Sequence, residues 1–143
     1  MRAAVLLGVV TALLPGCTST TSCTLADCQS SAVVTFPANL VSGAFDLIID
    51  GDESVTLRCL DPSAPETADN PDGITCNAEG FTIDGHPLAN EREILVTVIP
   101  TDGSEEQSAL VRLDAIETIT PNGPDCPPTC VLRNGRFEPV GGI

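Results

Sequence analysis

The sequence predicts an all-β fold, an Ig-like or related antiparallel β-sandwich of about seven or eight short strands held by disulfide bonds. Short runs of β-branched and apolar residues alternate with polar residues at a period of two. Clusters of Gly, Pro, Asn and Asp separate these runs, as turns do in all-β proteins. Seven cysteines in 143 residues indicate an exported, disulfide-bonded domain.

The expected strands follow one another along the chain with turns between them. They cover residues 31–36, 44–50 and 54–59, one or two short strands within 74–85, and then residues 92–100, 107–119 and 131–140. The clearest hairpin joins the second strand to the third. Alternate residues from Phe45 to Ile49 are apolar there, and Gly-Asp-Glu at 51–53 turns the chain.

Three segments interrupt the simple pattern. Residues 60–73 contain three prolines and no apolar periodicity, so we expect a long loop. Residues 107–119 are long enough for a bend or a bulge. The last segment forms either one strand or a short hairpin around Asn134-Gly135.

The N-terminus, MRAAVLLGVVTALLPGC, has the pattern of a secretory signal peptide. Arg2 supplies the positive charge, residues 3–14 form the apolar region, and the small residue Gly16 precedes Cys17. The last four residues of this run match a bacterial lipobox, with Pro15 in place of the usual small or hydroxyl residue. We therefore expect cleavage between Gly16 and Cys17 and acylation of Cys17, which tethers a protein to a membrane.

The cysteine count supports this expectation, because acylation of Cys17 removes one of seven cysteines and leaves an even set. The alternative is an ordinary signal peptide with an unpaired Cys17. The expected organisation is a signal peptide over 1–16, a lipidated cysteine and tether over 17–30, and one β-sandwich domain over 31–143. Within the tether, we expect residues 18–22 to be a flexible spacer. Thr18, rather than Asp, follows the acylation site, which favours the outer membrane of a bacterial cell envelope.

The six remaining cysteines predict three disulfides. Cys59 ends one expected strand and Cys76 lies in the next, so a bond between them would close the intervening loop. Cys126 and Cys130 flank Pro-Pro-Thr. A polyproline II path would hold their Cα atoms roughly 12 Å apart, beyond the ~7 Å limit for a disulfide.

We therefore expect Cys126 and Cys130 to pair with Cys23 and Cys28 and so join the two ends of the domain. The rival arrangement pairs Cys23 with Cys28 and Cys126 with Cys130, and the spacing leaves it open.

The segment NGPDCPPTC, residues 122–130, carries a resemblance. Together with the lipobox, the Ser/Thr-rich tether and the early cysteines, it resembles a group of small six-cysteine predicted lipoproteins of myxobacteria, which have an N-G-P-x-C-x-P-x-C element before a final strand. The resemblance covers essentially the whole mature chain. It implies a compact β-sandwich at the cell envelope, and it implies no catalytic residues.

The composition excludes several classes of partner. The chain has 20 Asp and Glu against six Lys and Arg, with a net charge of −14, so its field repels nucleic acid. It has four Phe and no Trp or Tyr, and hence few rings for stacking on sugars or bases. We expect no cofactor and no small-molecule substrate.

Two acidic turns are candidates for calcium. DGDES at 50–54 and DNPDG at 69–73 place hard oxygen ligands in turns, although neither has the spacing of a calcium-binding loop. Asp69 and Asp72 are the candidate ligands, and solvated surface charge is the alternative. A calcium-dependent rise in melting temperature that Asp69→Ala or Asp72→Ala abolishes would identify the site.

Catalysis has little support in the sequence. His86 is the one histidine, and it precedes a proline in a turn-like setting. No nucleophile motif accompanies it, so we expect a surface turn residue. The leading hypothesis is a non-catalytic, lipid-anchored envelope protein that acts as a structural or protein-binding module, with another envelope protein as a partner. The alternatives are a calcium-stabilised adhesion or binding module and a small envelope hydrolase.

Overall fold

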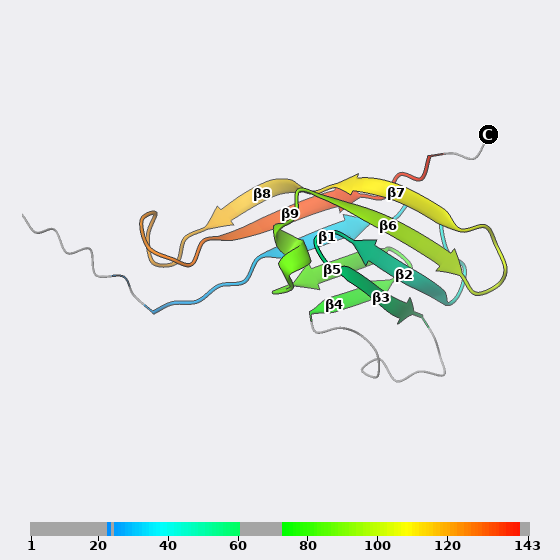
Figure 1. Ribbon diagram of the computed structural model, residues 1–143, viewed down its shortest axis with the longest axis horizontal. Coiled ribbons are helices and arrows are strands. Elements are labelled where there is room, and N and C mark those ends of the chain that lie inside the picture. Colours follow the sequence, from blue (N-terminus) through cyan, green and yellow to red (C-terminus); the bar gives the residue numbers. More distant parts are fainter. Residues whose placement is uncertain (1–22, 24, 61–72, 141–143) are drawn as a thin grey trace, which may run out of the picture.

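In the computed structural model, residue 23, residues 25–60 and residues 73–140 are described, and they form two β-sheets packed face to face (Figure 1). The strands are β1 Ser31–Thr35, β2 Phe45–Asp50, β3 Ser54–Cys59, β4 Ile74–Asn77, β5 Gly80–Asp84, β6 Glu93–Pro100, β7 Gln107–Arg112, β8 Asp114–Ile119 and β9 Cys130–Arg136. One short 3-10 helix, η1, covers Pro87–Asn90. The predicted all-β, disulfide-bonded sandwich is therefore confirmed.

Several predictions fall outside the described residues. These are the signal peptide, the acylation site Cys17, the spacer at 18–22 and the calcium candidates Asp69 and Asp72. Among the residues that are described, no helix is long and apolar enough to cross a membrane.

The strand order is that of an immunoglobulin-like sandwich except at one edge of the second sheet, which β9 and β8 form. The four-stranded sheet runs β3-β2-β6-β7, as strands C′, C, F and G do, and the other sheet runs β4-β5-β1-β9-β8. In that second sheet β4, β5 and β1 occupy the places of D, E and B. The C-terminal strand β9 occupies the place of the first strand, A, and pairs with β1 in parallel.

The structure has nine strands within these ranges, rather than about seven or eight. Residues 74–85 form two strands, β4 and β5, and residues 107–119 are divided between the two sheets. The division falls at Leu113, which is buried and whose N–H donates to the Arg92 carbonyl at 2.8 Å. β7 therefore forms the edge of one sheet and β8 the edge of the other.

This change of sheet explains why Asn134-Gly135 is not a turn. The corner at Leu113 packs directly on Gly135, where an added Cβ would lie 2.7 Å from a Val111 methyl and 2.9 Å from the Arg112 carbonyl oxygen. Gly135 lies inside β9, paired with Val34 of β1. Glycine is needed here because the crossing chain comes too close for a side chain.

The core contains all four aromatic rings of the chain. The ring of Phe36, just after β1, meets those of Phe45, Phe81 and Phe137 edge-on, with centroid separations of 6.0, 6.0 and 5.5 Å. Phe45 comes from the opposite sheet, so this cluster joins the two layers. Because each ring is at most 9% exposed, the surface offers no aromatic platform for stacking.

Candidate functional site

The most distinctive region joins the two ends of the domain through two disulfides. Cys23 bonds to Cys126 and Cys28 bonds to Cys130, with Cα separations of 5.6 and 6.1 Å. We call the described residues 23 and 25–30, together with residues 120–131 to which these bonds join them, the clamp. The structure thus has the long-range pairing favoured from the sequence and not the rival local pairing. The third bond, Cys59–Cys76, also matches its prediction.

The path between Cys126 and Cys130 differs from the expected one. The Pro127–Pro128 peptide bond is cis, so the segment is not a trans polyproline II stretch. Before it, the chain turns: the Gly123 N–H donates to the Thr120 carbonyl at 3.0 Å, and the Cys126 N–H donates to the Gly123 carbonyl at 3.2 Å. The pairing was predicted correctly from a backbone geometry that the structure does not have.

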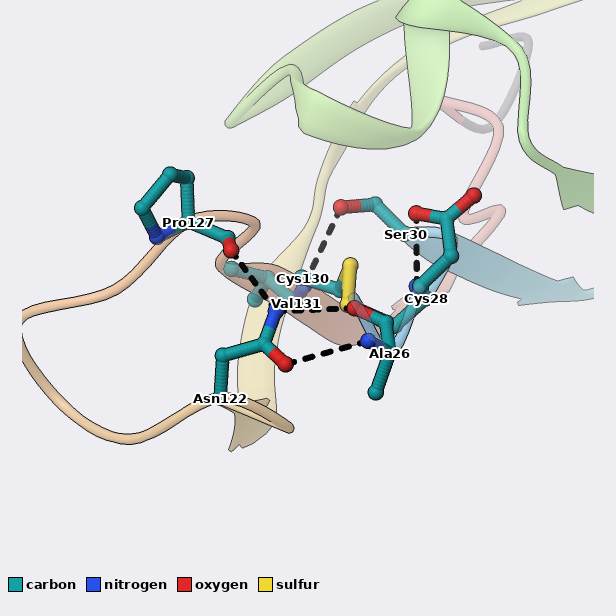
Figure 2. The surroundings of a disulfide bond; sticks show 8 residues. Ala26, Cys28, Ser30, Asn122, Pro127, Cys130 and Val131 are labelled. Carbon is teal, nitrogen blue, oxygen red and sulfur yellow. Dashed lines mark hydrogen bonds between the residues drawn. A yellow bond between two sulfur atoms is a disulfide. The ribbon is translucent and has the colours of Figure 1, made fainter. Parts of the chain in front are cut away.

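Asn122 is the polar centre of the clamp (Figure 2). Its Oδ1 accepts from the Ala26 N–H at 3.1 Å, and its Nδ2 donates to the carbonyl oxygens of Ala26 and Pro127 at 2.8 and 2.7 Å. The side chain therefore pairs with the backbone of residue 26 as a neighbouring strand would. It also fixes the proline loop of its own segment.

The neighbouring residues complete the clamp. Ser30 is buried, and its Oγ accepts from the Val131 N–H at 3.1 Å just beyond the second disulfide (Figure 2). Gly123, next to Asn122, has a φ of +97°, a conformation that glycine adopts without strain. The Asn, the Gly and both cysteines of NGPDCPPTC thus have separate roles in one structural junction, which explains why this stretch is so distinctive in the sequence.

Replacing Asn122 tests whether these hydrogen bonds stabilise the clamp. We expect Asn122→Ala to lower the free energy of unfolding by about 2–3 kcal/mol, because three bonds of roughly 0.5–1.5 kcal/mol each are lost at a partly exposed site. Asn122→Asp keeps the acceptor for Ala26 but loses both donors and turns a carboxylate toward two carbonyl oxygens. Asn122→Asp should therefore lower the free energy of unfolding by at least as much as Asn122→Ala. Urea unfolding measures both, and a loss below about 0.5 kcal/mol for both would contradict this role.

A cavity of about 250 Å³ opens beside the Cys28–Cys130 bond. Its polar lining comes from the clamp and from the β5–η1 connection, and includes Gln29, Ser30, His86, Asn90 and Thr129. It is smaller than the roughly 300–1,000 Å³ typical of small-molecule sites. Its polar groups are amides, hydroxyls and one imidazole.

His86 is mostly buried, with a side chain 15% exposed, and is not the surface residue that we expected. Its Nδ1 accepts from the Leu88 N–H at 3.3 Å, so the imidazole caps η1. Its Nε2 lies 3.7 Å from the Glu53 carboxylate in the β2–β3 turn. The hydrogen bond at Nδ1 therefore gives the imidazole a structural role at the start of η1.

The described acidic residues do not gather into a metal site. Within residues 23, 25–60 and 73–140, no group of three or more His, Cys, Asp or Glu side chains is placed to hold a metal ion. Two carboxylates pair instead with arginines: Asp46 of β2 with Arg58 of the neighbouring β3 at 2.6 Å, and Asp114 with Arg112 across the corner at Leu113 at 3.0 Å. The calcium prediction at Asp69 and Asp72 remains a prediction, since both lie outside the described residues.

One acidic turn has a locally stabilised carboxylate. In the β6–β7 connection the hydroxyl and the N–H of Ser104 both donate to the Asp102 carboxylate. These bonds, the hydroxyl first, hold the pKa of Asp102 below its ordinary value. The turn is solvent-exposed, so the effect shapes the turn rather than a binding site.

Comparison of the chain with protein-family models, with curated proteins and with solved structures finds no match. The resemblance to myxobacterial lipoproteins therefore remains an expectation from the sequence.

Proposed function

We propose that this protein is a lipid-anchored cell-envelope protein whose β-sandwich is a non-catalytic structural or protein-binding module. The observation that carries the proposal is the cysteine pairing. The six cysteines that the structure describes bond to one another, and the chain has seven. Cys17 is therefore left without a partner for an intramolecular disulfide, directly after the lipobox-like Leu14-Pro15-Gly16.

Two further features support the proposal. Three disulfides are typical of proteins that fold in an oxidising compartment outside the cytoplasm. The clamp holds the N-terminal segment against the domain, so a membrane anchor at Cys17 would pull on a covalently reinforced junction and not on β1 alone. The outer-membrane location and the relationship to the myxobacterial lipoproteins belong to the same proposal, and they rest on Thr18 and on residues 122–130.

The anchoring is tested by Cys17→Ala in a bacterium that exports and acylates lipoproteins. The wild-type protein should fractionate with membranes and yield an N-terminal peptide that begins at an acylated Cys17. The variant should lose the acyl groups and leave the membrane fraction, because each buried CH₂ contributes about 0.8 kcal/mol to membrane binding. A variant that stays in the membrane fraction without acyl groups would contradict the proposal.

The matched control removes a disulfide instead of the anchor. The pair of substitutions Cys23→Ala and Cys126→Ala also deletes sulfur atoms near the N-terminus but keeps Cys17, so it should remain acylated and membrane-bound. The protein-binding role is tested by crosslinking in intact cells. A discrete crosslinked partner of the wild-type protein that is lost with Cys17→Ala would support a role at the membrane.

A further inference from the structure

We propose that the clamp is the membrane-facing pole of the domain and that the β6–β7 turn, residues 101–106, lies at the pole pointing away from the lipid. The surface that the clamp faces is a lipid bilayer. The inference rests on the proposed acylation of Cys17 and adds an orientation to it.

The first step is the length of chain between the lipid and the clamp. Six residue steps separate Cys17 from Cys23. A fully extended chain advances at most about 3.3–3.6 Å per residue, so this distance is at most about 20 Å. Whatever path residues 18–22 take, the clamp stays within that distance of the acylated residue.

The second step is that the free length ends at Cys23 and not at the start of β1. Without the clamp, the linker would extend from Cys17 to Ser31 and could span about 50 Å. The disulfides of Cys23 and Cys28, together with the pairing of Ala26 to Asn122, fasten the intervening segment to the loop before β9. The clamp therefore converts a long linker into a short one.

The third step compares this tether with the domain. The N-terminal segment and the loop after β8 lie at one end of the long axis, and the β6–β7 turn lies at the other (Figure 1). β6 alone has eight residues, so its seven residue steps span about 23 Å between η1 and that turn. Placing residues 101–106 against the bilayer would lift Cys23 more than about 23 Å from it, which a tether of about 20 Å does not allow.

The charge of the clamp indicates that the tether, and not affinity for lipid, imposes this orientation. Residues 23–30 and 120–131 contain Asp27 and Asp125 and no Lys or Arg. Both carboxylate residues are exposed, so they repel anionic headgroups. The unacylated domain should therefore show no affinity for vesicles.

Energy transfer from the protein to the membrane surface tests the orientation. The acylated full-length protein is reconstituted into phosphatidylethanolamine–phosphatidylglycerol vesicles that contain an acceptor-labelled headgroup. A donor is attached through an azide-bearing amino acid at Asp125, in the clamp, or at Ser104, in the β6–β7 turn. We expect clearly higher transfer from position 125. Equal transfer, or higher transfer from position 104, would overturn the proposal.

Lengthening the tether separates its effect from direct contact with lipid. Inserting 12 Gly and Ser residues between Ser22 and Cys23 should reduce the difference between the two positions. An unchanged difference would show that the surface, and not the tether, sets the orientation. Cys17→Ala should abolish transfer at both positions. If the measured mass of the wild-type protein shows no acyl group, the proposed function itself fails. This result is obtained before any orientation is measured, so the two failures can be told apart.

Discussion

Removal of both clamp disulfides should lower the free energy of unfolding by about 7.5 kcal/mol, whereas removal of either one should cost only about 3 kcal/mol. The two bonds have sequence separations of 103 and 102, so each closes nearly the same long loop. In the chain-entropy model a loop of that length contributes about 4.7 kcal/mol. Once one bond has closed it, the other closes only a ring of roughly ten residues, which contributes slightly under 3 kcal/mol.

The loss of stability on removing both bonds should therefore exceed the sum of the two single losses, because either bond alone keeps the long loop closed. Cys→Ala pairs at 23/126, at 28/130 and at all four positions give the comparison by urea unfolding. A loss near 4.7 kcal/mol for each single pair, or a combined loss no larger than the sum of the two, would contradict this account. The Cys59–Cys76 pair, with a separation of 17, is the control, because its loss of about 3 kcal/mol should add to either clamp pair.

Phe36→Ala should be the most damaging single substitution in the core, with a loss of about 3–5 kcal/mol. Its ring takes part in all three aromatic pairs of the structure and connects the sheets through Phe45. Removing it opens a cavity that the rings of Phe81 and Phe137 cannot both fill. The three edge-on contacts, each of roughly 0.5–1.5 kcal/mol beyond buried area, are lost together.

Two variants calibrate this measurement. Phe36→Leu keeps much of the volume and should cost clearly less than Phe36→Ala, because it loses the ring contacts but leaves a smaller void. Val33→Ala, on the outward face of β1 and 44% exposed, should change stability by about 0.5 kcal/mol or less. If Phe36→Ala cost no more than Val33→Ala, the aromatic cluster would not be what joins the sheets.

The fold class was predictable because β2 and β3 alternate at a period of two. Every second residue is buried in both strands, and the residues between are half-buried in β2 and exposed in β3, a pattern that a helix does not produce. The corner at Leu113 was not predictable. Residues 107–119 predicted one long strand with a bend or a bulge but no change of sheet, and that change depends on Gly135, which lies 22 positions later in the chain. Local sequence gives no sign of which distant glycine leaves room for a crossing chain.

The candidate site, like the fold, was only partly predictable from the sequence. The long-range cysteine pairing was predicted, but the argument for it assumed an extended trans path between Cys126 and Cys130, where the structure has a cis Pro127–Pro128 bond. The role of Asn122 could not be predicted, because its partner Ala26 is 96 residues away and contributes only backbone groups, which leave no trace in side-chain identity. His86 was assigned to the surface because a proline follows it, yet the same proline begins the short helix that the imidazole caps.

The clamp also changes what a protease can do to this protein. The bonds at 23–126 and 28–130 join the N-terminal segment covalently to the segment that precedes β9, so the chain between them forms a closed loop. One peptide-bond cleavage anywhere between Cys23 and Cys130 leaves both fragments joined, and a cleavage between Cys59 and Cys76 is bridged a second time by their own disulfide. A nicked molecule would keep all of its parts attached to the N-terminal segment until the disulfides were reduced. Shedding of the domain by a single cut would therefore have to occur before residue 23.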